Sequence, residues 1–337
     1  MIRRTLLRSA LALVAISFLS LPAHAGLFRA YVSSTGNDAN ACTLQAPCRL
    51  LPAALVAVSD GGEIWMLDSA NYNTGPVNIT KSVTILAIPG AVGSVLANGG
   101  DAIDIATAGV KVALRNLVIV PLPGGGGTNG INMTNGASLT VEGCLIANLP
   151  GTGIFVSGAT SVQVTGTTIR GNNGYGLWLQ DGASATITQA TISRNINEGV
   201  LVGGGTASTT TTADIADSTM AANYSGVVAY SVIATAVVKV SIRDSRLVRN
   251  ALWGTDAYST AGAAVTLSLS NNIVSNNAYG IGSLSAGGKV VASGNTVTDN
   301  SISGLYNSGG LLESAGNNTV RNNGTNTSGT ITTVGTL

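Results

Sequence analysis

Short segments in which apolar and polar residues alternate recur along most of the chain. Clear examples are Leu139-x-Val141, Val162-x-Val164 and Ala185-x-Ile187. A period of two residues is typical of β-strands, because successive side chains of a strand point to opposite faces of the sheet. Turn-forming residues interrupt these segments after a few positions, so the pattern predicts a fold built of many short strands.

An Asn-containing element repeats together with the strands. An apolar residue followed three positions later by Asn occurs eight times, at intervals of 23 to 28 residues. The eight pairs are Leu145/Asn148, Ile169/Asn172, Ile192/Asn195, Met220/Asn223, Leu247/Asn250, Ile273/Asn276, Val297/Asn300 and Val320/Asn323. A Gly follows each of the first seven Asn within three to five residues, and a second short strand then begins. A repeat of this length is typical of solenoid proteins.

These two signals predict the fold class. We expect an all-β chain folded as a single-stranded right-handed parallel β-helix of about ten coils, in which each strand pairs with its equivalent about 4.8 Å away in the next coil. The Asn residues are expected in tight turns, because Asn adopts the left-handed conformation at low cost and stacked Asn side chains hydrogen-bond to one another. The longer coils predict outward loops at 121–129, 203–212 and 258–264.

The first residues have the pattern of a secretory signal peptide. Arg3, Arg4 and Arg8 precede an apolar run, and Ala23-His24-Ala25 has the small residues of a cleavage site. We therefore expect cleavage after Ala25 to remove residues 1–25, and a bacterial protein that is secreted or periplasmic. The paired arginines leave export by the twin-arginine route open as an alternative.

The rest of the chain is expected to have three parts. Residues 26–62 form an N-terminal segment that includes a capping helix, residues 63–325 form the β-helix, and residues 326–337 form a C-terminal tail. The helix is predicted between Cys48 and Val58, with a Pro in its first turn. A cap is needed because the end of a β-helix exposes unpaired strand edges.

The cysteines fit an exported chain. Cys42 and Cys48 are close in sequence and flank a loop that contains a Pro, so we expect them to form a disulfide in an oxidising compartment. Cys144 is left over and is expected to be a packed thiol. No metal site is predicted at the cysteines, because Cys-x5-Cys without His lacks the ligands that zinc prefers.

Charge and composition narrow the function classes. Sixteen Lys and Arg residues, three of which lie in 1–25, stand against fifteen Asp and Glu residues, and the single His also lies in 1–25. The lack of a basic excess argues against a nucleic-acid partner. No later segment reaches about 18 uninterrupted apolar residues, so no membrane span is predicted. No cofactor is predicted, since Gly124–Gly127 lacks the Lys-Ser/Thr of a phosphate loop; the oligomeric state stays open.

A set of motifs stands at the start of the expected mature chain. It consists of Tyr31-Val32-Ser33-Ser34-Thr35-Gly36-Asn37-Asp38, then Ala46-Pro47-Cys48-Arg49, then Gly62-Glu63-Ile64. This set resembles the N-terminal part of pectate-lyase-like β-helix proteins, with Leu50 where that group usually has Thr and Glu63 where it has Asp. The resemblance covers about 30–325. It implies a right-handed β-helix, with polysaccharide lyases, hydrolases or epimerases as relatives.

The catalytic residues of such relatives are not recognisable in this sequence. The resemblance implies clustered Asp residues and Gly-His-Gly for a galacturonan hydrolase, or acidic Ca²⁺ ligands and an Arg or Lys base for a lyase. The best acidic cluster is Asp214 and Asp217 with Asp244 in the next coil, which we interpret as surface charge answered by nearby arginines. No catalytic residue and no metal ligand is therefore predicted.

The strand that follows each recurring Gly predicts a functional surface. Its first outward column is Phe155, Trp178, Leu201, Val228, Asp256, Gly282 and Tyr306, and its second is Ser157, Gln180, Gly203, Tyr230, Tyr258, Leu284 and Ser308. Aromatic residues are 4% of the chain, yet five of them fall in these two columns, and an exposed apolar patch usually marks a contact site. The predicted ligand-binding residues are Phe155, Trp178, Gln180, Tyr230, Asp256 and Tyr258. Two alternatives are that the loops at 203–212 and 258–264 bury the rings, and that the surface binds a second copy of the chain.

Three functions remain open at this stage. The first is non-catalytic binding of a polysaccharide or other cell-envelope glycan by an exported β-helix. The second is a polysaccharide-active enzyme of the lyase, hydrolase or epimerase type. The third is a structural or adhesive rod.

Overall fold

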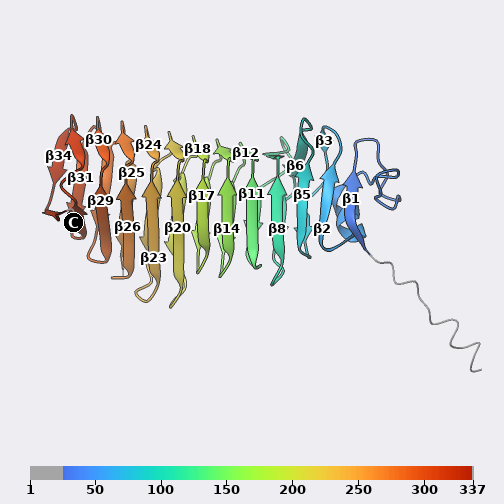
Figure 1. Ribbon diagram of the computed structural model, residues 1–337, viewed down its shortest axis with the longest axis horizontal. Coiled ribbons are helices and arrows are strands. Elements are labelled where there is room, and N and C mark those ends of the chain that lie inside the picture. The colour runs from blue at the N-terminus through green and yellow to red at the C-terminus, as the bar shows by residue number, and fades with distance from the viewer. Residues whose placement is uncertain (1–25, 261, 336–337) are drawn as a thin grey trace, which may run out of the picture.

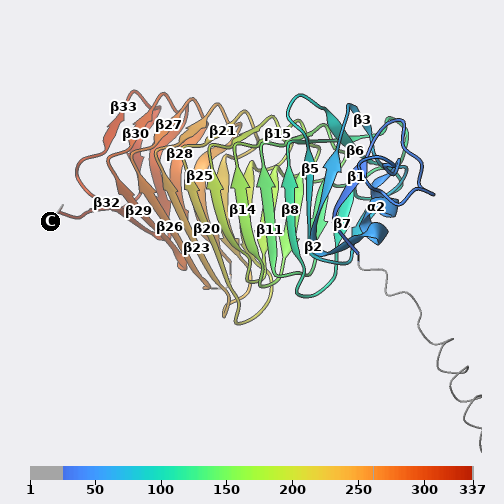
Figure 2. The same ribbon diagram turned by 45° about the vertical axis from the view of Figure 1, so that its right-hand side comes forward.

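The strands stack into one long parallel β-helix, as Figures 1 and 2 show. The computed structural model describes residues 26–260 and 262–335. Three sheets run along the molecule, and two of them have eleven strands each, so the chain makes about eleven turns. This confirms the all-β parallel β-helix predicted from the sequence. The predicted signal peptide, residues 1–25, lies outside the described residues.

The strands of the first sheet, sheet A, are the longest of most turns. They are, in their spatial order, β1 (Leu27–Val32), β2 (Val58–Met66), β5 (Val83–Ala87), β8 (Lys111–Arg115), β11 (Ser138–Glu142), β14 (Ser161–Thr165), β17 (Ser184–Thr188), β20 (Thr210–Ala216), β23 (Val237–Arg243), β26 (Ala264–Ser270), β29 (Gly288–Ser293), β32 (Leu311–Ser314) and β35 (Ile331–Thr333). Strand order equals chain order, as expected when each turn adds one strand to each sheet.

Sheet B follows sheet A in each turn and has mostly three-residue strands. They are β3 (Ala70–Asn71), β6 (Gly93–Ala97), β9 (Leu117–Pro121), β12 (Leu145–Ala147), β15 (Thr168–Arg170), β18 (Thr191–Ser193), β21 (Thr219–Ala221), β24 (Arg246–Val248), β27 (Ile273–Ser275), β30 (Thr296–Thr298) and β33 (Thr319–Arg321).

Sheet C completes each turn before the chain returns to sheet A. Its strands are β4 (Val77–Ile79), β7 (Ile103–Ile105), β10 (Ile131–Met133), β13 (Ile154–Ser157), β16 (Leu177–Gln180), β19 (Val200–Gly204), β22 (Val227–Ser231), β25 (Trp253–Ser259), β28 (Tyr279–Leu284), β31 (Ser303–Ser308) and β34 (Thr325–Ser328). Strands β34 and β35 pair in parallel with the preceding turn, so the stack continues past residue 325 into the segment predicted as a tail.

The core is a set of apolar ladders inside the three sheets. In sheet A, Ile64, Ile85 and Leu114 occupy successive turns in register, and each is completely buried. The alternating pattern of the sequence produces these ladders, because the parallel register places equivalent inward residues on top of one another. Burial of these side chains is the main favourable term in the stability of the stack.

One short helix closes the N-terminal end of the stack (Figure 2). Helix α2 spans Leu51–Ala57, has a Pro in its first turn and buries Leu51, Ala54 and Leu55, which confirms the predicted cap. The Oδ1 atom of Asp38 accepts the backbone N–H groups of Arg49 and Leu50 directly before the helix, each at 2.8 Å. None of the described residues form a helix with the length and hydropathy of a membrane span.

The cysteine prediction is confirmed. Cys42 and Cys48 form a disulfide that closes the loop before α2, with their Cα atoms 4.6 Å apart. Cys144 is free and buried between sheets A and B. Burial raises the pKa of its thiol to about 11, although N–H groups of neighbouring backbone lower it in part, so this thiol is unreactive at neutral pH.

A ladder of buried Asn side chains lies in the turn between sheets B and C. In each step the Oδ1 atom of one Asn accepts the backbone N–H of the Asn in the preceding turn, at 2.9 to 3.2 Å. The members are Asn172, Asn195, Asn223, Asn250, Asn277, Asn300 and Asn323. Two of the predicted members were wrong: Asn148 and Asn276 lie one residue before the ladder position, which Leu149 and Asn277 occupy.

The conformation expected for the ladder Asn belongs to the residue before it. The φ angle is +61° at Asn148, +56° at Arg194, +57° at Ala222 and +59° at Asn276, all at this preceding position. The ladder Asn instead carries the hydrogen bonds, and its side chain satisfies backbone N–H groups that the turn would otherwise leave buried and unpaired. A second ladder, between sheets A and B, was missed: Ser218, Ser245, Asn272 and Asn295 link successive turns in the same way.

The recurring Gly fits closely against this Asn ladder. A Cβ added to Gly176 would lie 2.5 Å from the carbonyl oxygen of Gly199 and 2.9 Å from Nδ2 of Asn195. The equivalent Gly residues in the neighbouring turns meet the same two kinds of atom. Gly is therefore required here because the backbone of the next turn and the ladder amide occupy the space of a side chain.

Candidate functional site

The outer face of sheet C carries the two columns predicted from the sequence. Phe155, Trp178, Leu201, Val228 and Asp256 are partners in successive strands, and the register continues to Gly282 and Tyr306. In the second column Ser157, Gln180, Gly203, Tyr230, Tyr258 and Leu284 are partners in the same way. The spatial alignment of the predicted residues is thus confirmed, while their role in binding stays a prediction.

The aromatic rings of this face lie in three contacting groups. Group one is Phe155, Tyr175 and Trp178, with ring centroids about 5 Å apart; group two is the stacked pair Tyr230 and Tyr258, at 5.7 Å; group three is Trp253, Tyr279 and Tyr306, at 4.3 to 5.7 Å. Such contacts stabilise ring pairs beyond simple burial. The groups follow one another from β13 to β31, a distance of roughly 29 Å at the spacing of parallel strands.

Three of these rings were missed in the sequence. Tyr175, Trp253 and Tyr279 stand directly before the recurring Gly, where the sequence pattern predicts a turn and not a strand. The structure turns this position toward the outer face of sheet C, next to the first outward column. The recurring residue before the Gly is the signal that could have identified them.

Most of these rings are partly exposed, whereas Trp253 is buried. Phe155, Trp178, Tyr230, Tyr258 and Tyr306 are each of intermediate exposure, so each presents part of its ring to solvent. The loops predicted near 203–212 and 258–264 connect sheets C and A. An apolar surface of this extent is typical of a contact site.

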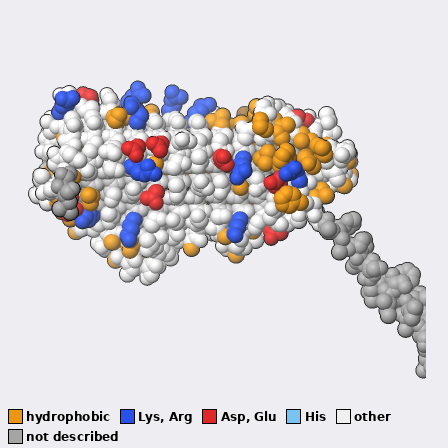
Figure 3. Space-filling model, viewed as in Figure 1, with side chains coloured by type: hydrophobic (Ala, Val, Ile, Leu, Met, Phe, Trp, Pro, Cys, Tyr) orange, Lys and Arg blue, Asp and Glu red, His pale blue; other side chains and the backbone are white. Residues whose placement is uncertain are grey.

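The face formed by sheet A is of a different kind (Figure 3). Its outward residues in successive turns are Thr140, Gln163, Thr186, Asp214 and Ser241. In Figure 3 most of this face is uncharged and polar, and hydrophobic side chains gather mainly at the end near α2. The aromatic surface is therefore a property of sheet C and not of the solenoid in general.

A cleft with two acidic side chains opens in the middle of the aromatic surface. It has a volume of about 220 Å³. Its lining comprises Glu198, Tyr224, Ser225, Val228, Leu252, Trp253, Asp256, Tyr258 and Leu284. Asp256, predicted to point outward, is only 4% exposed, and its Oδ1 atom has no hydrogen-bond partner.

The two acids of this cleft are electrostatically uncompensated. Burial raises the pKa of Asp256 well above its usual range, and the nearby negative charge of Glu198 raises it further. Burial likewise raises the pKa of Glu198. Glu198 lies in the turn next to Tyr175, since the N–H of Gly176 donates to its carbonyl oxygen at 3.0 Å, and the pKa of Tyr175 is raised by burial and then by the charge of Glu198. A strongly perturbed acid in a cleft is typical of a functional site.

The predicted binding residues therefore divide into two subsites. Asp256 and Tyr258 line the acidic cleft from β25, and Tyr230 of the adjacent strand β22 stacks on Tyr258. Phe155, Trp178 and Gln180 lie on β13 and β16, two to four strands away, which is roughly 10 to 19 Å. The structure brings all six onto one face but not into one pocket.

The other acidic residues singled out in the sequence do not form a comparable site. Asp214 is exposed on sheet A, and Asp217 and Asp244 lie in turns between sheets A and B. Of the arginines expected to answer them, Arg243 forms an ion pair with Asp244 at 3.6 Å. Among the described residues, no group of three or more potential ligands is arranged to hold a metal ion.

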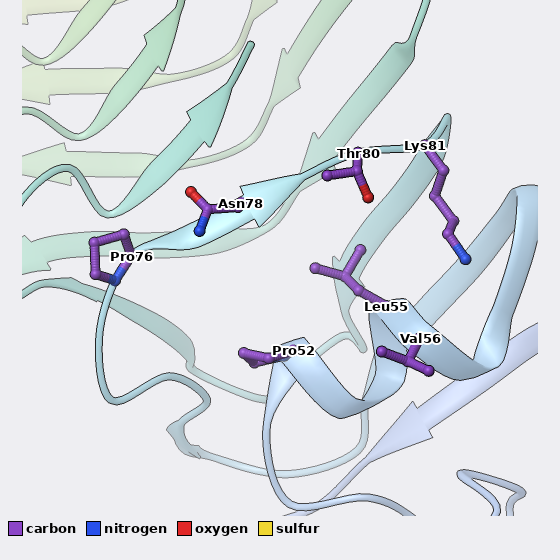
Figure 4. Close-up of a pocket in the computed structure, with 7 residues that line it drawn as sticks. All are labelled: Pro52, Leu55, Val56, Pro76, Asn78, Thr80 and Lys81. Carbon is purple, nitrogen blue, oxygen red and sulfur yellow. The ribbon is translucent and has the colours of Figure 1, made fainter. Parts of the chain in front are cut away.

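A larger pocket lies at the N-terminal end, between α2 and β4 (Figure 4). It has a volume of about 390 Å³ and is lined by Pro52, Leu55, Val56, Pro76, Asn78, Thr80 and Lys81. The Nζ atom of Lys81 donates to the carbonyl oxygen of Val58 at 2.8 Å, so the ammonium group of Lys81 lies against the end of the capping helix. This pocket has apolar walls but few convergent polar groups, and we regard it as a gap beside the cap.

Known proteins resemble the chain in fold. Residues 91–231 match the family described as "Right handed beta helix region". The complex of XylC with xylose is 8% identical over 80% of this chain and 69% of that one, with a TM-score of 0.52. The periplasmic alginate epimerase AlgG is 13% identical over 91% and 84%, with a TM-score of 0.50. Pectate lyase Pel9A is 16% identical over 91% and 77%, with a TM-score of 0.49.

No curated protein matches the sequence. At these identities the solved structures establish the fold and nothing more, and the strand register and the family match agree with it. The chain is therefore a protein with the right-handed parallel β-helix fold.

Proposed function

We propose that the protein binds a glycan chain along the outer face of sheet C. The observation that carries the proposal is the row of ring groups on this face. Eight of the fourteen Phe, Trp and Tyr residues of the chain lie in it: Phe155, Tyr175, Trp178, Tyr230, Trp253, Tyr258, Tyr279 and Tyr306. Seven of these rings are partly exposed and Trp253 is buried. Partly exposed rings present flat apolar surfaces, which suit the apolar faces of sugar rings, and they need little further ordering.

Polar groups beside the rings suit the hydroxyl groups of a sugar. Gln180 lies next to Trp178 in β16, and Ser157 Oγ donates to Asp181 at 3.2 Å on the same side of the sheet. The fold neighbours support a glycan as the ligand class, since one is a complex with xylose and another is an alginate epimerase. The N-terminal sequence pattern and the Cys42–Cys48 disulfide support an exported location, secreted or periplasmic, where such glycans occur.

Glycan binding without catalysis is the first form of this proposal. A polysaccharide-active enzyme is the second, and one observation favours it: burial raises the pKa of Asp256, which lines a cleft together with a second carboxyl, and a raised carboxyl pKa is typical of a general acid. Release of new reducing ends or of unsaturated products from a polysaccharide panel, abolished by Asp256→Asn, would favour the second form. Binding without any product favours the first.

The ring surface is tested with variants of the two subsites and a matched control. Trp178→Ala and Tyr258→Ala remove one ring from each subsite. The control is Trp65→Ala, because Trp65 is an outward ring of sheet A that also contacts a Tyr, at 6.3 Å. We expect the double variant Trp178→Ala/Tyr258→Ala to lose at least tenfold in affinity for the glycan found on an array, measured by calorimetry, and the control to retain its affinity.

Two results would contradict the proposal. One is equal loss in the Trp65→Ala control, which would place binding elsewhere or show a general loss of structure. The other is unchanged affinity in the double variant with an unchanged melting temperature. A melting temperature that falls sharply in Trp178→Ala alone would show that this ring is a packing residue, and the Tyr258→Ala variant would then decide.

A further inference from the structure

The acidic cleft on sheet C has negative groups and no positive partner. Of its nine lining residues two are acids, Glu198 and Asp256, three are aromatic, and none is Lys or Arg. Within the part of the chain that the structure describes, neither acid takes part in an ion pair shorter than 4.0 Å. Asp256 is 96% buried, its Oδ1 atom has no hydrogen-bond partner, and the residue lines the cleft.

This arrangement is costly in the unliganded protein. A buried carboxyl without a hydrogen-bond partner or counter-charge is destabilising, and proteins keep such groups mainly where function needs them. A cation placed between Glu198 and Asp256 would restore the missing interaction and would favour the ionised form of both acids. The missing component of the cleft is therefore a positive charge.

The residues that line the cleft indicate which kind of cation it would bind. Tyr224, Trp253 and Tyr258 line it, and aromatic faces attract ammonium groups, most strongly when the cation leaves water behind. A Ca²⁺ ion takes 6 to 8 oxygen ligands, and this cleft offers two carboxyl groups among apolar side chains. The composition fits an organic ammonium group better than a metal ion.

The negative charge on the outer face of sheet C also favours a cationic ligand. The strands of sheet C contain Asp104 and Asp256 and no Lys or Arg. Glu198 and Asp181 lie beside the strands on the same side. An anionic polymer such as a polyuronate would be repelled from this face, whereas a cationic one would be attracted.

We propose that the cleft formed by Glu198, Asp256, Tyr224, Trp253 and Tyr258 binds an organic ammonium group, and that on the glycan surface this group is the protonated amine of an amino sugar. The second part rests on the proposed glycan-binding function; the first does not. A ligand with this chemistry is a glycan whose amino sugars are not N-acetylated. Rings in the neighbouring groups would contact the adjoining sugars of the same chain.

The amine is tested with matched oligosaccharides. A β-1,4-linked hexamer of glucosamine and the same hexamer fully N-acetylated differ in the charged groups and keep the same linkage. We expect calorimetry at pH 6.5 to give at least tenfold tighter binding of the free amine form. Tetramethylammonium serves as a small cation without a sugar, and we expect weak binding in the millimolar range that Tyr258→Ala abolishes.

The carboxyl groups are tested with neutral isosteres. Asp256→Asn and Glu198→Gln should each reduce affinity for the glucosamine hexamer at least tenfold and leave the N-acetylated hexamer unchanged. The control is Asp214→Asn, which removes one negative charge from an exposed position on sheet A and should change affinity less than twofold. Asp256→Asn should fold, because it replaces a buried uncompensated acid with a neutral side chain of the same shape.

The pH dependence of ligand affinity is a further test, because it would not change if the two acids only had a packing role. The acids in or near the cleft are Glu198 and Asp256, and the phenols are Tyr175, Tyr224, Tyr230 and Tyr258. Because burial raises the pKa of both acids, binding of tetramethylammonium, whose charge does not titrate, should strengthen as pH rises through their pKa values. Asp256→Asn should weaken that dependence.

The outcomes separate the two proposals. Equal affinity for the free amine and N-acetylated hexamers would overturn the amino-sugar assignment and leave glycan binding intact, and no binding of tetramethylammonium would overturn the ammonium site itself. Tetramethylammonium binding that requires Asp256, without binding of any hexamer or array glycan, would support the cation cleft and overturn glycan binding. Ca²⁺ binding at this cleft that blocks tetramethylammonium with higher affinity would overturn the choice of an organic cation.

Discussion

The Asn ladder gives the sharpest prediction about stability. Asn195 is 3% exposed, and its side chain joins two turns of the stack. Its Oδ1 atom accepts the backbone N–H of Asn172 at 3.2 Å and the Nδ2 group of Asn172 at 2.9 Å, while its own Nδ2 donates to Asn223 at 2.9 Å. The substitution Asn195→Ala removes these three hydrogen bonds at once.

The magnitude follows from what is left unpaired. Two donors of Asn172 lose their acceptor in the interior, where water cannot replace it, and each unsatisfied buried group costs about 1–3 kcal/mol. We expect Asn195→Ala to lower the free energy of unfolding by about 2–4 kcal/mol. Asn323→Ala should cost less, about 1 kcal/mol, because that Asn lies in a part-exposed turn where water can bind its partners.

The assay is chemical unfolding followed by circular dichroism and by tryptophan fluorescence. Coincidence of the two curves shows whether one free energy describes the unfolding, which is not assured in a solenoid. The control is Asn148→Gly, since Asn148 precedes the ladder, is exposed and has a φ of +61° that Gly adopts freely. We expect this control to change stability by less than about 0.5 kcal/mol. Equal losses for Asn195→Ala and the control would refute a stabilising role for the ladder.

Two further predictions concern other parts of the fold. Gly176→Ala should destabilise strongly and reduce soluble yield, because the new Cβ would lie 2.5 Å from the backbone oxygen of Gly199; an equally stable variant by thermal melting would show that the turns can separate to accept it. Burial alone would raise the pKa of Asp68, but hydrogen bonds from Tyr72, Ser34 and Ser33 lower it to about 2. Since a depressed acid pKa stabilises the fold above its unfolded value near 4, the stability difference between the wild type and Asp68→Asn should be complete at pH 7 and shrink between about pH 4 and pH 2; a difference independent of pH would refute this assignment.

The ladders and columns of the fold could be predicted from the sequence because the repeat is periodic. Once the strands stack in register, the repeat period alone determines which residues of the two neighbouring strands lie beside Phe155. The error at Asn148 and Asn276 has a simple cause. Both Asn occupy the left-handed position, where Asn is common, and a pattern based on residue type cannot distinguish this position from the ladder position one residue later.

The acidic cleft could not be predicted from the sequence. Glu198 stands in a turn of one coil and Asp256 in a strand two coils later, so no motif joins them. Asp256 is buried in a cleft that Trp253 and Tyr258 also line, whereas alternation alone assigns every outward residue to solvent. Packing of unlike side chains on the outer face, which breaks the repeat, is the information that only the structure supplies.

The central claim is that sheet C, and not sheet A, is the glycan-binding face, and the three Trp residues of the chain test it most directly. Trp178 and Trp253 belong to the ring groups of sheet C, whereas Trp65 lies on sheet A. Their indole N–H signals can be assigned in ¹H–¹⁵N spectra with single Trp→Phe variants and followed while the glucosamine hexamer, or the tightest glycan of the array, is added. The account predicts that the signals of Trp178 and Trp253 shift with one dissociation constant while that of Trp65 stays in place. A shift of Trp65 alone, or no shift of any indole at saturating ligand, would contradict it.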